Sequence, residues 1–196
     1  MEIILVRHGA TAWTAERRYQ GQTDIPLSDI GEAEAAALRP VLEPLVRPDT
    51  RIFSSDLSRA RRTAELSLPS SSVTLDARLR EIHFGAFEGL TFDENRARFP
   101  ELFPDGQVHP QYVTGPEGES LDALQTRLFG WLHELDAEHV IAFTHGGVIR
   151  AFLGAWLDCG WASEQIGRIS TGQARAVRLD ASRKRILDGP FCLEAA

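Results

Sequence analysis

The segment Arg7-His8-Gly9 places, within three residues, side chains that could transfer a phosphoryl group. The imidazole of His8 is a nitrogen nucleophile, and the guanidinium of Arg7 can bind phosphate oxygens through two parallel hydrogen bonds. Gly9 has no side chain, so a phosphate could approach the backbone closely there. Such residues also occur together in ordinary surface loops, so the segment by itself predicts only a candidate phosphate site.

Two more polar segments stand in similar positions along the chain. Short apolar runs at residues 3–6, 51–54 and 140–144 predict buried strands, and each run ends in polar residues. The polar segments are Arg7-His8-Gly9, Ser54-Ser55-Asp56 and Thr144-His145-Gly146-Gly147. Open α/β sheets bind their ligands beyond the carboxyl ends of the parallel strands. We therefore expect the three segments to meet at one edge of a sheet.

Helical patterns separate these predicted strands, at residues 28–45, 56–68, 120–135 and 147–157. Ser28 is suited to cap the first of these helices, and either Ser55 or Asp56 is suited to cap the second. Pro40 and Pro44 should kink or split the end of the first helix, because proline lacks the amide that a helix interior requires.

Strands that alternate with helices predict an α/β fold. We expect a three-layer α/β/α sandwich around a mostly parallel sheet, in a single domain that covers residues 1–196. A short strand at residues 73–75 and a closing hairpin at residues 174–179 and 184–187 complete the predicted sheet. Residues 87–119 lack a regular pattern and are rich in proline, glycine and aromatic residues, so we expect a short lid inserted over the sheet edge.

The composition narrows the classes of function. The chain has 196 residues and a net charge of −7, which argues against a surface for nucleic acid or anionic membranes. No apolar run approaches the roughly 20 residues that span a bilayer. Two cysteines, Cys159 and Cys192, make neither a disulfide framework nor a metal motif, so no metal and no cofactor are expected. We expect a cytoplasmic protein whose partners are a small phosphomonoester and, at most, a second copy in a homodimer.

Four parts of the chain together resemble the histidine phosphatase (phosphoglycerate mutase-like) superfamily, and within it the small bacterial-type phosphatases. The first part consists of VRHGATAW at residues 6–13 and YQGQTDIPLS at residues 19–28, and the other three are SSDLSRARRTA at residues 54–64, LREIHFGAFEG at residues 79–89, and THGG at residues 144–147. They follow one another in the family's order. The resemblance implies a phosphatase that works through a phosphohistidine and without a metal.

The resemblance also implies a role for each matching residue. His8 is the expected nucleophile. Arg7, Arg59 and His145 are expected to surround the phosphoryl oxygens and to stabilise the charge on them. Glu81 is expected to give a proton to the leaving oxygen and then to activate water. A histidine nucleophile must be neutral to attack, whereas Glu81 must begin protonated, which requires burial or a nearby anion.

Further contacts to the phosphate are implied for Thr14, Gln20, Gly21 and Gly146. At residue 14 the family usually has asparagine, whose amide helps to bind phosphate, whereas this chain has threonine. The hydroxyl of Thr14 keeps one donor but lacks the reach of the amide. Residue 14 is therefore a departure from the family's pattern.

The predicted lid bears on the choice of substrate. Residues 84–119 hold two basic residues, Arg96 and Arg98, against seven acidic ones, together with six aromatic residues. Such a lid favours a neutral or partly apolar leaving group over a second anion, although the aromatic residues could equally form the lid's own core. We therefore expect a phosphatase for a small metabolite, such as a sugar or nucleoside phosphate. The alternatives are a cofactor-dependent phosphoglycerate mutase and, more remotely, an inactive phosphate-binding domain.

Overall fold

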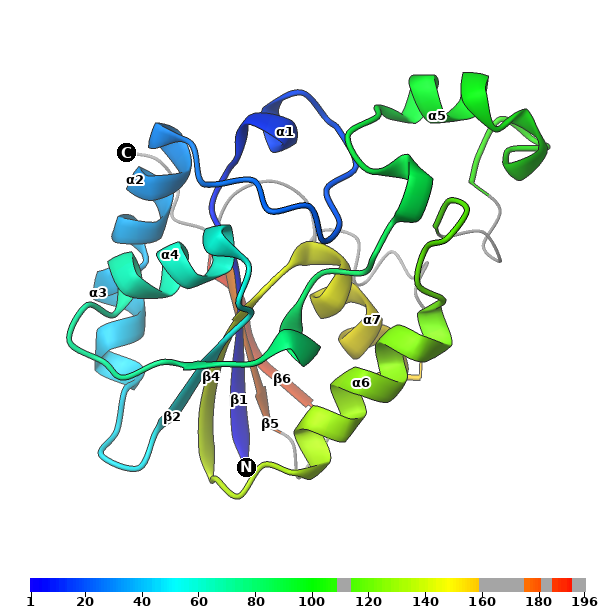
Figure 1. The fold of residues 1–196 in the computed structure, drawn as a ribbon. Coiled ribbons are helices and arrows are strands. Elements are labelled where there is room, and N and C mark those ends of the chain that lie inside the picture. Colours follow the sequence, from blue (N-terminus) through cyan, green and yellow to red (C-terminus); the bar gives the residue numbers. More distant parts are fainter. Residues whose placement is uncertain (109–113, 159–174, 181–184, 192–196) are drawn as a thin grey trace.

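The computed structural model describes residues 1–108, 114–158, 175–180 and 185–191 (Figure 1). Its centre is a six-stranded sheet with the strand order β3-β2-β4-β1-β5-β6. The strands are β1 (Glu2–Arg7), β2 (Arg51–Ser54), β3 (Thr74–Leu75), β4 (His139–Thr144), β5 (Arg175–Asp180) and β6 (Arg185–Phe191). The first four pair in parallel, whereas β5 pairs antiparallel with both β1 and β6. The predicted α/β class and the closing hairpin are confirmed.

Some predicted features lie outside the described residues. These are Ala174 and Lys184 at the starts of the predicted hairpin strands, both cysteines, Cys159 and Cys192, and Tyr112 of the predicted lid. Among the described residues, no helix has the length and apolarity that crossing a membrane requires.

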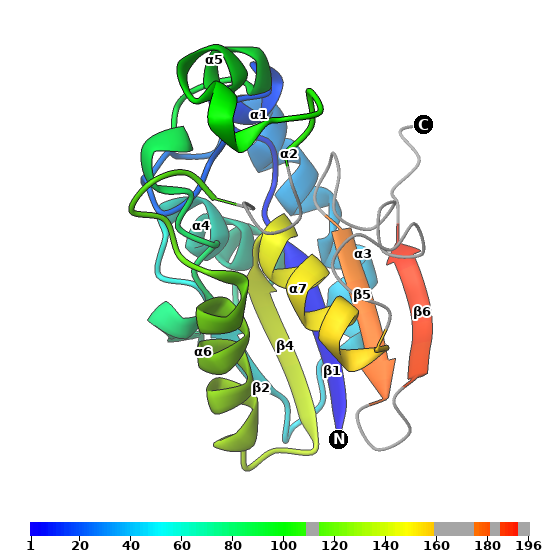
Figure 2. The same cartoon turned by 90° about the vertical axis from the view of Figure 1, so that its right-hand side faces the viewer.

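Helices cover both faces of the sheet, as predicted (Figures 1 and 2). One face carries α2 (Asp29–Ala37), α3 (Arg39–Leu42) and α4 (Ser58–Ser67), and the other carries α6 (Leu121–His133) and α7 (Gly146–Trp156). Strand β1 is apolar throughout its centre because both of its faces are buried. Ile3 and Leu5 pack into the cluster that includes α6 and α7, whereas Ile4 and Val6 pack into the cluster on the opposite face.

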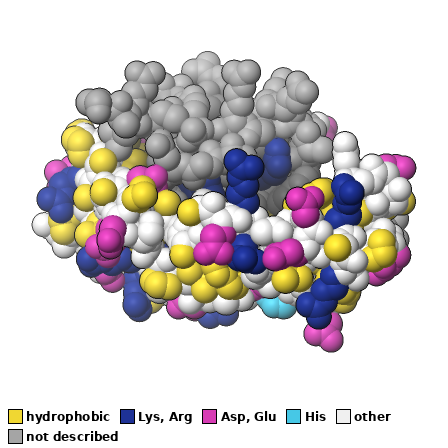
Figure 3. Space-filling view, turned by 90° about the horizontal axis from the view of Figure 1, so that it is seen from above, with side chains coloured by type: hydrophobic (Ala, Val, Ile, Leu, Met, Phe, Trp, Pro, Cys, Tyr) yellow, Lys and Arg dark blue, Asp and Glu magenta, His cyan; other side chains and the backbone are white. Residues whose placement is uncertain are grey.

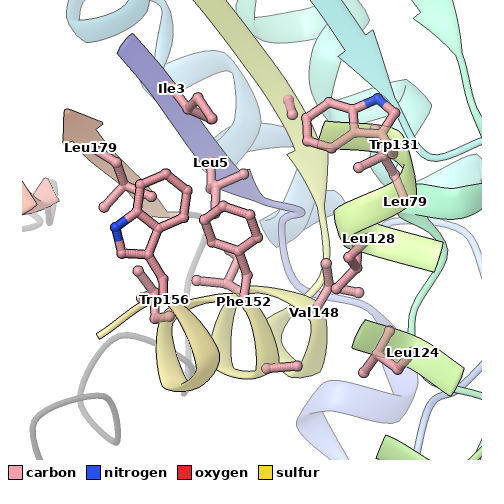
Figure 4. Packing of buried hydrophobic residues seen from close by; sticks show 14 of the residues in the cluster. Ile3, Leu5, Leu79, Leu124, Leu128, Trp131, Val148, Phe152, Trp156 and Leu179 are labelled. Carbon is pink, nitrogen blue, oxygen red and sulfur yellow. The ribbon is translucent and has the colours of Figure 1, made fainter. Parts of the chain in front are cut away.

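The larger cluster positions α7 against the sheet (Figure 4). Phe152 and Trp156 of α7 lie beside Leu5 of β1, and the ring centroids of these two aromatic residues are 4.8 Å apart. Trp131 of α6 lies at the other end of the same cluster. Each fully buried side chain of this size contributes about 1.5–3 kcal/mol to folding. The start of α7 is therefore held at the carboxyl end of β4.

The predicted helix caps are partly confirmed. Ser28 caps α2, because its hydroxyl accepts from the amide of Gly31 (3.2 Å), and the predicted break near Pro40 separates α2 from α3. The prediction for the second helix was wrong. Helix α4 begins at Ser58, after Leu57, and the side chain of Asp56 instead forms an ion pair with Arg80.

A carboxylate from elsewhere replaces the missing cap of α4. Both the amide and the hydroxyl of Ser58 donate to Asp24, at 2.8 and 2.7 Å. Asp56 does not cap α4 because the guanidinium of Arg80 donates two parallel charged hydrogen bonds to its carboxylate. Such bonds are stronger than a single hydrogen bond from a backbone amide.

The segment predicted as a lid contains a short helix, α5 (Phe92–Arg98), which lies beyond the carboxyl ends of the strands, on the same side of the sheet as the one-turn helix α1 (Ala12–Ala15) (Figures 1 and 2). Phe87 is buried there, with ring centroids 5.6 Å from Phe99 and 5.7 Å from Phe103. These aromatic residues form the segment's own core, which is one of the two predicted readings.

Candidate active site

The parallel pairing of β1 and β4 brings the first and third polar segments together. Arg7 stands opposite Thr144 in the register, so His8 and His145 follow on adjacent strands. The amide of His8 donates to the carbonyl of Thr144 (3.1 Å), and the two imidazole centroids are 5.1 Å apart. The amide of Ser55 donates to the carbonyl of Phe143 (2.9 Å), so the second segment joins them. The three predicted segments therefore meet at one sheet edge.

His8 is held in one tautomer. Its Nδ1 lies 2.7 Å from the carbonyl of Gly9, and because a carbonyl can only accept, Nδ1 carries the proton. The other ring nitrogen, Nε2, then keeps its lone pair. Burial lowers the pKa of His8 well below 6.5, and the guanidinium groups of Arg59 and Arg7 lower it further. The ring is therefore neutral in mildly acidic solution.

Gly9 is required by packing between the loop and helix α2. A Cβ at Gly9 would clash with the carbonyl of Gly31, and a Cβ at Gly31 would clash with the carbonyl of Ala10. The amide of Gly9 donates to the hydroxyl of Thr63 on α4 (3.2 Å). Helices α2 and α4 thus hold the backbone that carries His8.

Arg59 is a fully buried guanidinium on α4. Its Nη1 donates to the carbonyl of Thr23 (3.0 Å) and its Nη2 to the carbonyl of Gly21 (2.6 Å). Burial lowers the pKa of Arg59 to about 10, and the nearby carboxylates Glu81 and Asp24 oppose this shift. Arg59 therefore remains a cation at neutral pH.

Gly21 has a different position from the one predicted for a phosphate contact. It is buried, its carbonyl accepts from Arg59, and it is not among the described residues that line the pocket. A Cβ at Gly21 would clash with the carboxylate of Glu88. That carboxylate accepts from the amides of Gln22 (3.0 Å), Thr23 (2.8 Å) and Phe84 (3.0 Å), so Glu88 ties the loop after α1 to the segment after Glu81.

Glu81 lies against the start of α7. Its carboxylate accepts from the amides of Gly147 (2.9 Å), Val148 (3.1 Å) and Ile82 (2.9 Å). Burial raises the pKa of Glu81 above its ordinary value, although the amides of Gly147 and Ile82 and the guanidinium of Arg59 pull the pKa down. The net rise favours a protonated carboxyl, which is the state that an acid catalyst needs.

His145 occupies the position before α7 and is fully buried. Within the described part of the chain, neither of its ring nitrogens has a hydrogen-bond partner. Burial lowers the pKa of His145 well below 6.5, and Arg59 lowers it further. Its ring is neutral and can donate one N–H to a bound ligand.

A pocket of about 350 Å³ opens over His8. Of the residues predicted for the site, those that line it are Arg7, His8, Thr14, Gln20, Glu81 and Gly146. The hydroxyl of Thr14 lies 2.9 Å from that of Thr11, which in turn donates to the Gln20 side-chain carbonyl (3.0 Å). The Gln20 amide nitrogen is then left without a partner among the described residues. It can donate to a phosphate oxygen.

Five further residues line the pocket that the sequence did not single out: Arg17, Arg18, Tyr19, Phe84 and Gly147. All except Arg17 lie within or directly next to the matched motifs, so their place in the sequence could have identified them as candidate site residues. Seen from above, arginine side chains lie near the middle of this face, with acidic side chains among them (Figure 3). Within the described ranges, no group of three His, Cys, Asp or Glu side chains could hold a metal ion.

Comparison with known proteins finds relatives across most of the chain. The family model for the histidine phosphatase superfamily (branch 1) matches residues 3–188. Phosphoglycerate mutase-like protein 4 of Arabidopsis thaliana is 37% identical over 160 residues, 76% of this chain and 68% of that protein. Metal-independent phosphoserine phosphatase of the same plant is 36% identical over 158 residues, 76% of this chain and 66% of that protein. The chain thus spans about two thirds of the length of these two relatives.

A solved structure extends the likeness over the whole chain. The crystal structure of a phosphoglycerate mutase from Thermus thermophilus is 40% identical, with a TM-score of 0.75. The match covers 99% of this chain and 100% of that one.

Proposed function

The chain belongs to the histidine phosphatase superfamily (branch 1), and from this membership we propose that it is a metal-independent phosphatase. It removes the phosphoryl group from a small phosphorylated metabolite, such as a sugar or nucleoside phosphate. The group passes first to His8 and then to water. The metal-independent phosphoserine phosphatase among its relatives supports hydrolysis as the reaction.

In the first step, Nε2 of His8 attacks phosphorus, and a nitrogen–phosphorus bond replaces the bond from phosphorus to the leaving oxygen. Glu81 gives its proton to that oxygen, so the leaving group departs as a neutral alcohol. Arg7, Arg59 and the N–H of His145 stabilise the charge on the three equatorial oxygens. The unpartnered amide of Gln20 can add a neutral donor.

In the second step, water attacks the phosphohistidine. The carboxylate of Glu81, now deprotonated, takes a proton from the water as the new oxygen–phosphorus bond forms. The nitrogen–phosphorus bond breaks, Nε2 regains its lone pair, and inorganic phosphate leaves. The enzyme ends in the protonation state in which it began.

The observation that carries this proposal is the opposite shift of two pKa values in one pocket. The pKa of His8 is lowered and that of Glu81 is raised, so a neutral nucleophile and a protonated acid can coexist. Both shifts favour the neutral form of the group, and a neutral imidazole beside a neutral carboxyl is what a nucleophile and an acid catalyst require. The inactive alternative has little support, because the chain retains His8, Arg59 and Glu81.

The test follows both the phosphoryl adduct and its fate. A slowed reaction, quenched and analysed by mass spectrometry, should show an acid-labile phosphoryl group on the peptide that contains His8. His8→Ala should abolish turnover and adduct together. At roughly pH 5 to 7, where His8 is neutral and Glu81 can be protonated, inorganic phosphate should be released.

The same assay decides between hydrolysis and the mutase alternative, which the Thermus thermophilus structure keeps open. Fast interconversion of 2- and 3-phosphoglycerate with negligible release of phosphate would establish a mutase. An adduct on Ser54 or Ser55, or normal turnover by His8→Ala, would rule out the His8 mechanism itself.

A further inference from the structure

Arg17 occupies a backbone position that glycine usually takes. It follows α1, and its φ is 55°, in the left-handed region. The amide of Arg17 donates to the carbonyl of Thr14 (3.2 Å), and the amide of Arg18 donates to that of Trp13 (2.9 Å). These two bonds make the turn that commonly ends a helix with glycine, because a Cβ strains this conformation. An arginine here carries a conformational cost that glycine would avoid.

The two adjacent arginines of the pocket differ in their partners. Arg18 donates to Glu16 (2.6 Å), to Glu94 (2.9 Å) and to the carbonyl of Gly89 (2.8 Å), so its charge is engaged by the protein. The guanidinium of Arg17 has no hydrogen bond and no ion pair with any residue that the structure describes. Its side chain lines the pocket and is exposed. Arg17 is therefore a cation available to a ligand.

None of the seven acidic residues of the predicted lid, all of which the structure describes, lines the pocket, and three of them have partners in the protein. Glu88 accepts backbone amides, Glu94 pairs with Arg18, and Glu119 pairs with Arg127 at 2.7 Å. Among the described residues that line the pocket, Glu81 is the single acid. The acidic surplus of residues 84–119 therefore does not line the pocket and does not disfavour an anionic leaving group there.

We propose that Arg17 binds an anionic group, a carboxylate or a second phosphate, on the leaving half of the substrate. The proposal rests on the function proposed above, because it needs the transferred phosphoryl group at His8, where Arg7 and Arg59 serve it. A guanidinium binds either oxyanion through two parallel hydrogen bonds. The pocket then distinguishes substrates by what their leaving group carries, and its preferred substrates are phosphomonoesters with a second negative charge.

The test compares substrates that differ in the second anion alone. Phosphoserine is paired with phosphoethanolamine, 3-phosphoglycerate with glycerol 3-phosphate, and fructose 1,6-bisphosphate with fructose 1-phosphate. The measured quantity is the rate of His8 phosphorylation at subsaturating substrate, which does not depend on whether water or another acceptor later removes the group. The first two pairs report on a carboxylate, and the third reports on a second phosphate.

The wild-type protein should prefer the anionic member of at least one pair, and Arg17→Gly should reduce that preference about tenfold, as expected for one charged hydrogen-bonding group. Glycine suits the backbone there, so the variant should unfold at no lower denaturant concentration. Arg17→Gln, which removes the charge but keeps the backbone strain, should reduce the preference similarly. Arg98→Gln removes the same charge from α5, outside the pocket lining, and should leave the preference unchanged.

The outcomes separate the two proposals. Phosphorylation of His8 with an equal preference in the wild type and Arg17→Gly would overturn the anion site and leave the phosphatase standing. A wild-type preference, in every pair, for the member that lacks the second anion would do the same. Absence of phosphohistidine with every substrate would overturn both.

Discussion

At the scale of single residues, burial moves the two central groups in opposite directions. An imidazole is neutral when deprotonated and a carboxyl is neutral when protonated, so the same desolvation lowers the pKa of His8 and raises that of Glu81. The surrounding charges are uneven in effect. Arg59 reinforces the shift of His8 and opposes the shift of Glu81, whose carboxylate also accepts three backbone amides. The pKa of Glu81 is therefore set by opposing effects, whereas burial and the arginines both lower the pKa of His8.

Replacing Glu81 should change both the rate and its pH dependence. We expect Glu81→Gln to lower kcat/KM for alkyl phosphates about 10²–10⁴-fold, the usual contribution of a general acid. The wild-type profile should fall on its acid side through the lowered pKa of His8 and on its alkaline side through the raised pKa of Glu81, and the alkaline fall should be smaller in the variant. Dividing the wild-type pH profile of kcat/KM by that of Glu81→Gln cancels the contribution of the substrate's own titration, which is the same in both.

The leaving group provides the control for this prediction. p-Nitrophenolate leaves without a proton, so the phosphorylation burst from p-nitrophenyl phosphate should be much less impaired in Glu81→Gln. Equal impairment with p-nitrophenyl and alkyl phosphates would show that Glu81 acts by holding the loop rather than as an acid.

The cationic side chains bear on metal dependence. In the mechanism proposed above, Arg7 in the pocket lining and the buried Arg59 provide the positive charge that a metal ion provides in other phosphatases. Activity should therefore survive incubation with EDTA, whereas vanadate, which mimics the trigonal-bipyramidal phosphorus, should inhibit. Loss of activity in EDTA that Mg²⁺ or Mn²⁺ restores would contradict this expectation.

At the scale of elements, two close packings hold the site. The loop that carries His8 packs on α2 through Gly9 and Gly31, each of which has the other segment's backbone where a Cβ would lie. Glu81 packs on the start of α7, where a Cβ at Gly147 would clash with its carboxylate. The helix amides fix the carboxylate of Glu81, and α7 is itself fixed by the core (Figure 4).

Two helical glycines should respond oppositely to the same substitution. In Gly31→Ala the new methyl clashes with the carbonyl of Ala10, so we expect a loss of about 1–3 kcal/mol in the free energy of unfolding and reduced activity, since the loop of His8 must move. In Gly130→Ala, on α6, the methyl meets no atom within 4 Å. That variant should gain about 0.5–1 kcal/mol, the difference in helix propensity.

Urea unfolding of the two variants, with activity measured alongside, checks this contrast. Equal changes in stability for Gly31→Ala and Gly130→Ala would show that the packing between α2 and the loop is looser than described.

At the scale of the whole molecule, the charged residues of the candidate site lie at one edge of the sheet, and the apolar core lies between the sheet and the helices on its two faces. His8 and His145 lie where these regions meet, and both rings are buried and neutral. Below about pH 6.5 the unfolded chain would bind a proton on each of these two rings, whereas the folded chain leaves both unprotonated. The stability of the molecule is linked to the site through these two rings.

Stability should accordingly fall as the solution becomes acidic. Below about pH 6.5 the unfolded chain takes up protons on these histidines and the folded chain does not, so the free energy of unfolding decreases by up to roughly 1 kcal/mol per pH unit for each ring. The raised pKa of Glu81 acts in the opposite direction, because the folded state then binds the extra proton. The contribution of one histidine is isolated by comparing His145→Gln with the wild type.

Urea unfolding between roughly pH 7.5 and pH 5 should show a shallower decline in His145→Gln. His133→Gln, which removes an exposed histidine of α6, should follow the wild type. Parallel curves for the wild type and His145→Gln would show that His145 does not carry this linkage.

The sequence by itself determined the features that depend on neighbouring residues. Apolar runs predicted β1, β2 and β4, Ser28 predicted the start of α2, and the alternation of strands and helices predicted the fold class. The convergence of His8 and His145 also followed, because parallel strands end at the same edge of a sheet. These inferences succeed because the hydrophobic pattern of a short segment is set by that segment's own residues.

Only the tertiary structure decided where side chains distant in the chain find their partners. Asp56 was expected to cap α4, but it pairs with Arg80, and Asp24 takes over the cap. The acids of residues 84–119 were counted against a second anion, yet the pocket lining holds Arg17 in their place. Charges and hydrogen bonds act through space between segments tens of residues apart, so their pairing cannot be read from order along the chain. It becomes visible once packing has fixed which segments meet.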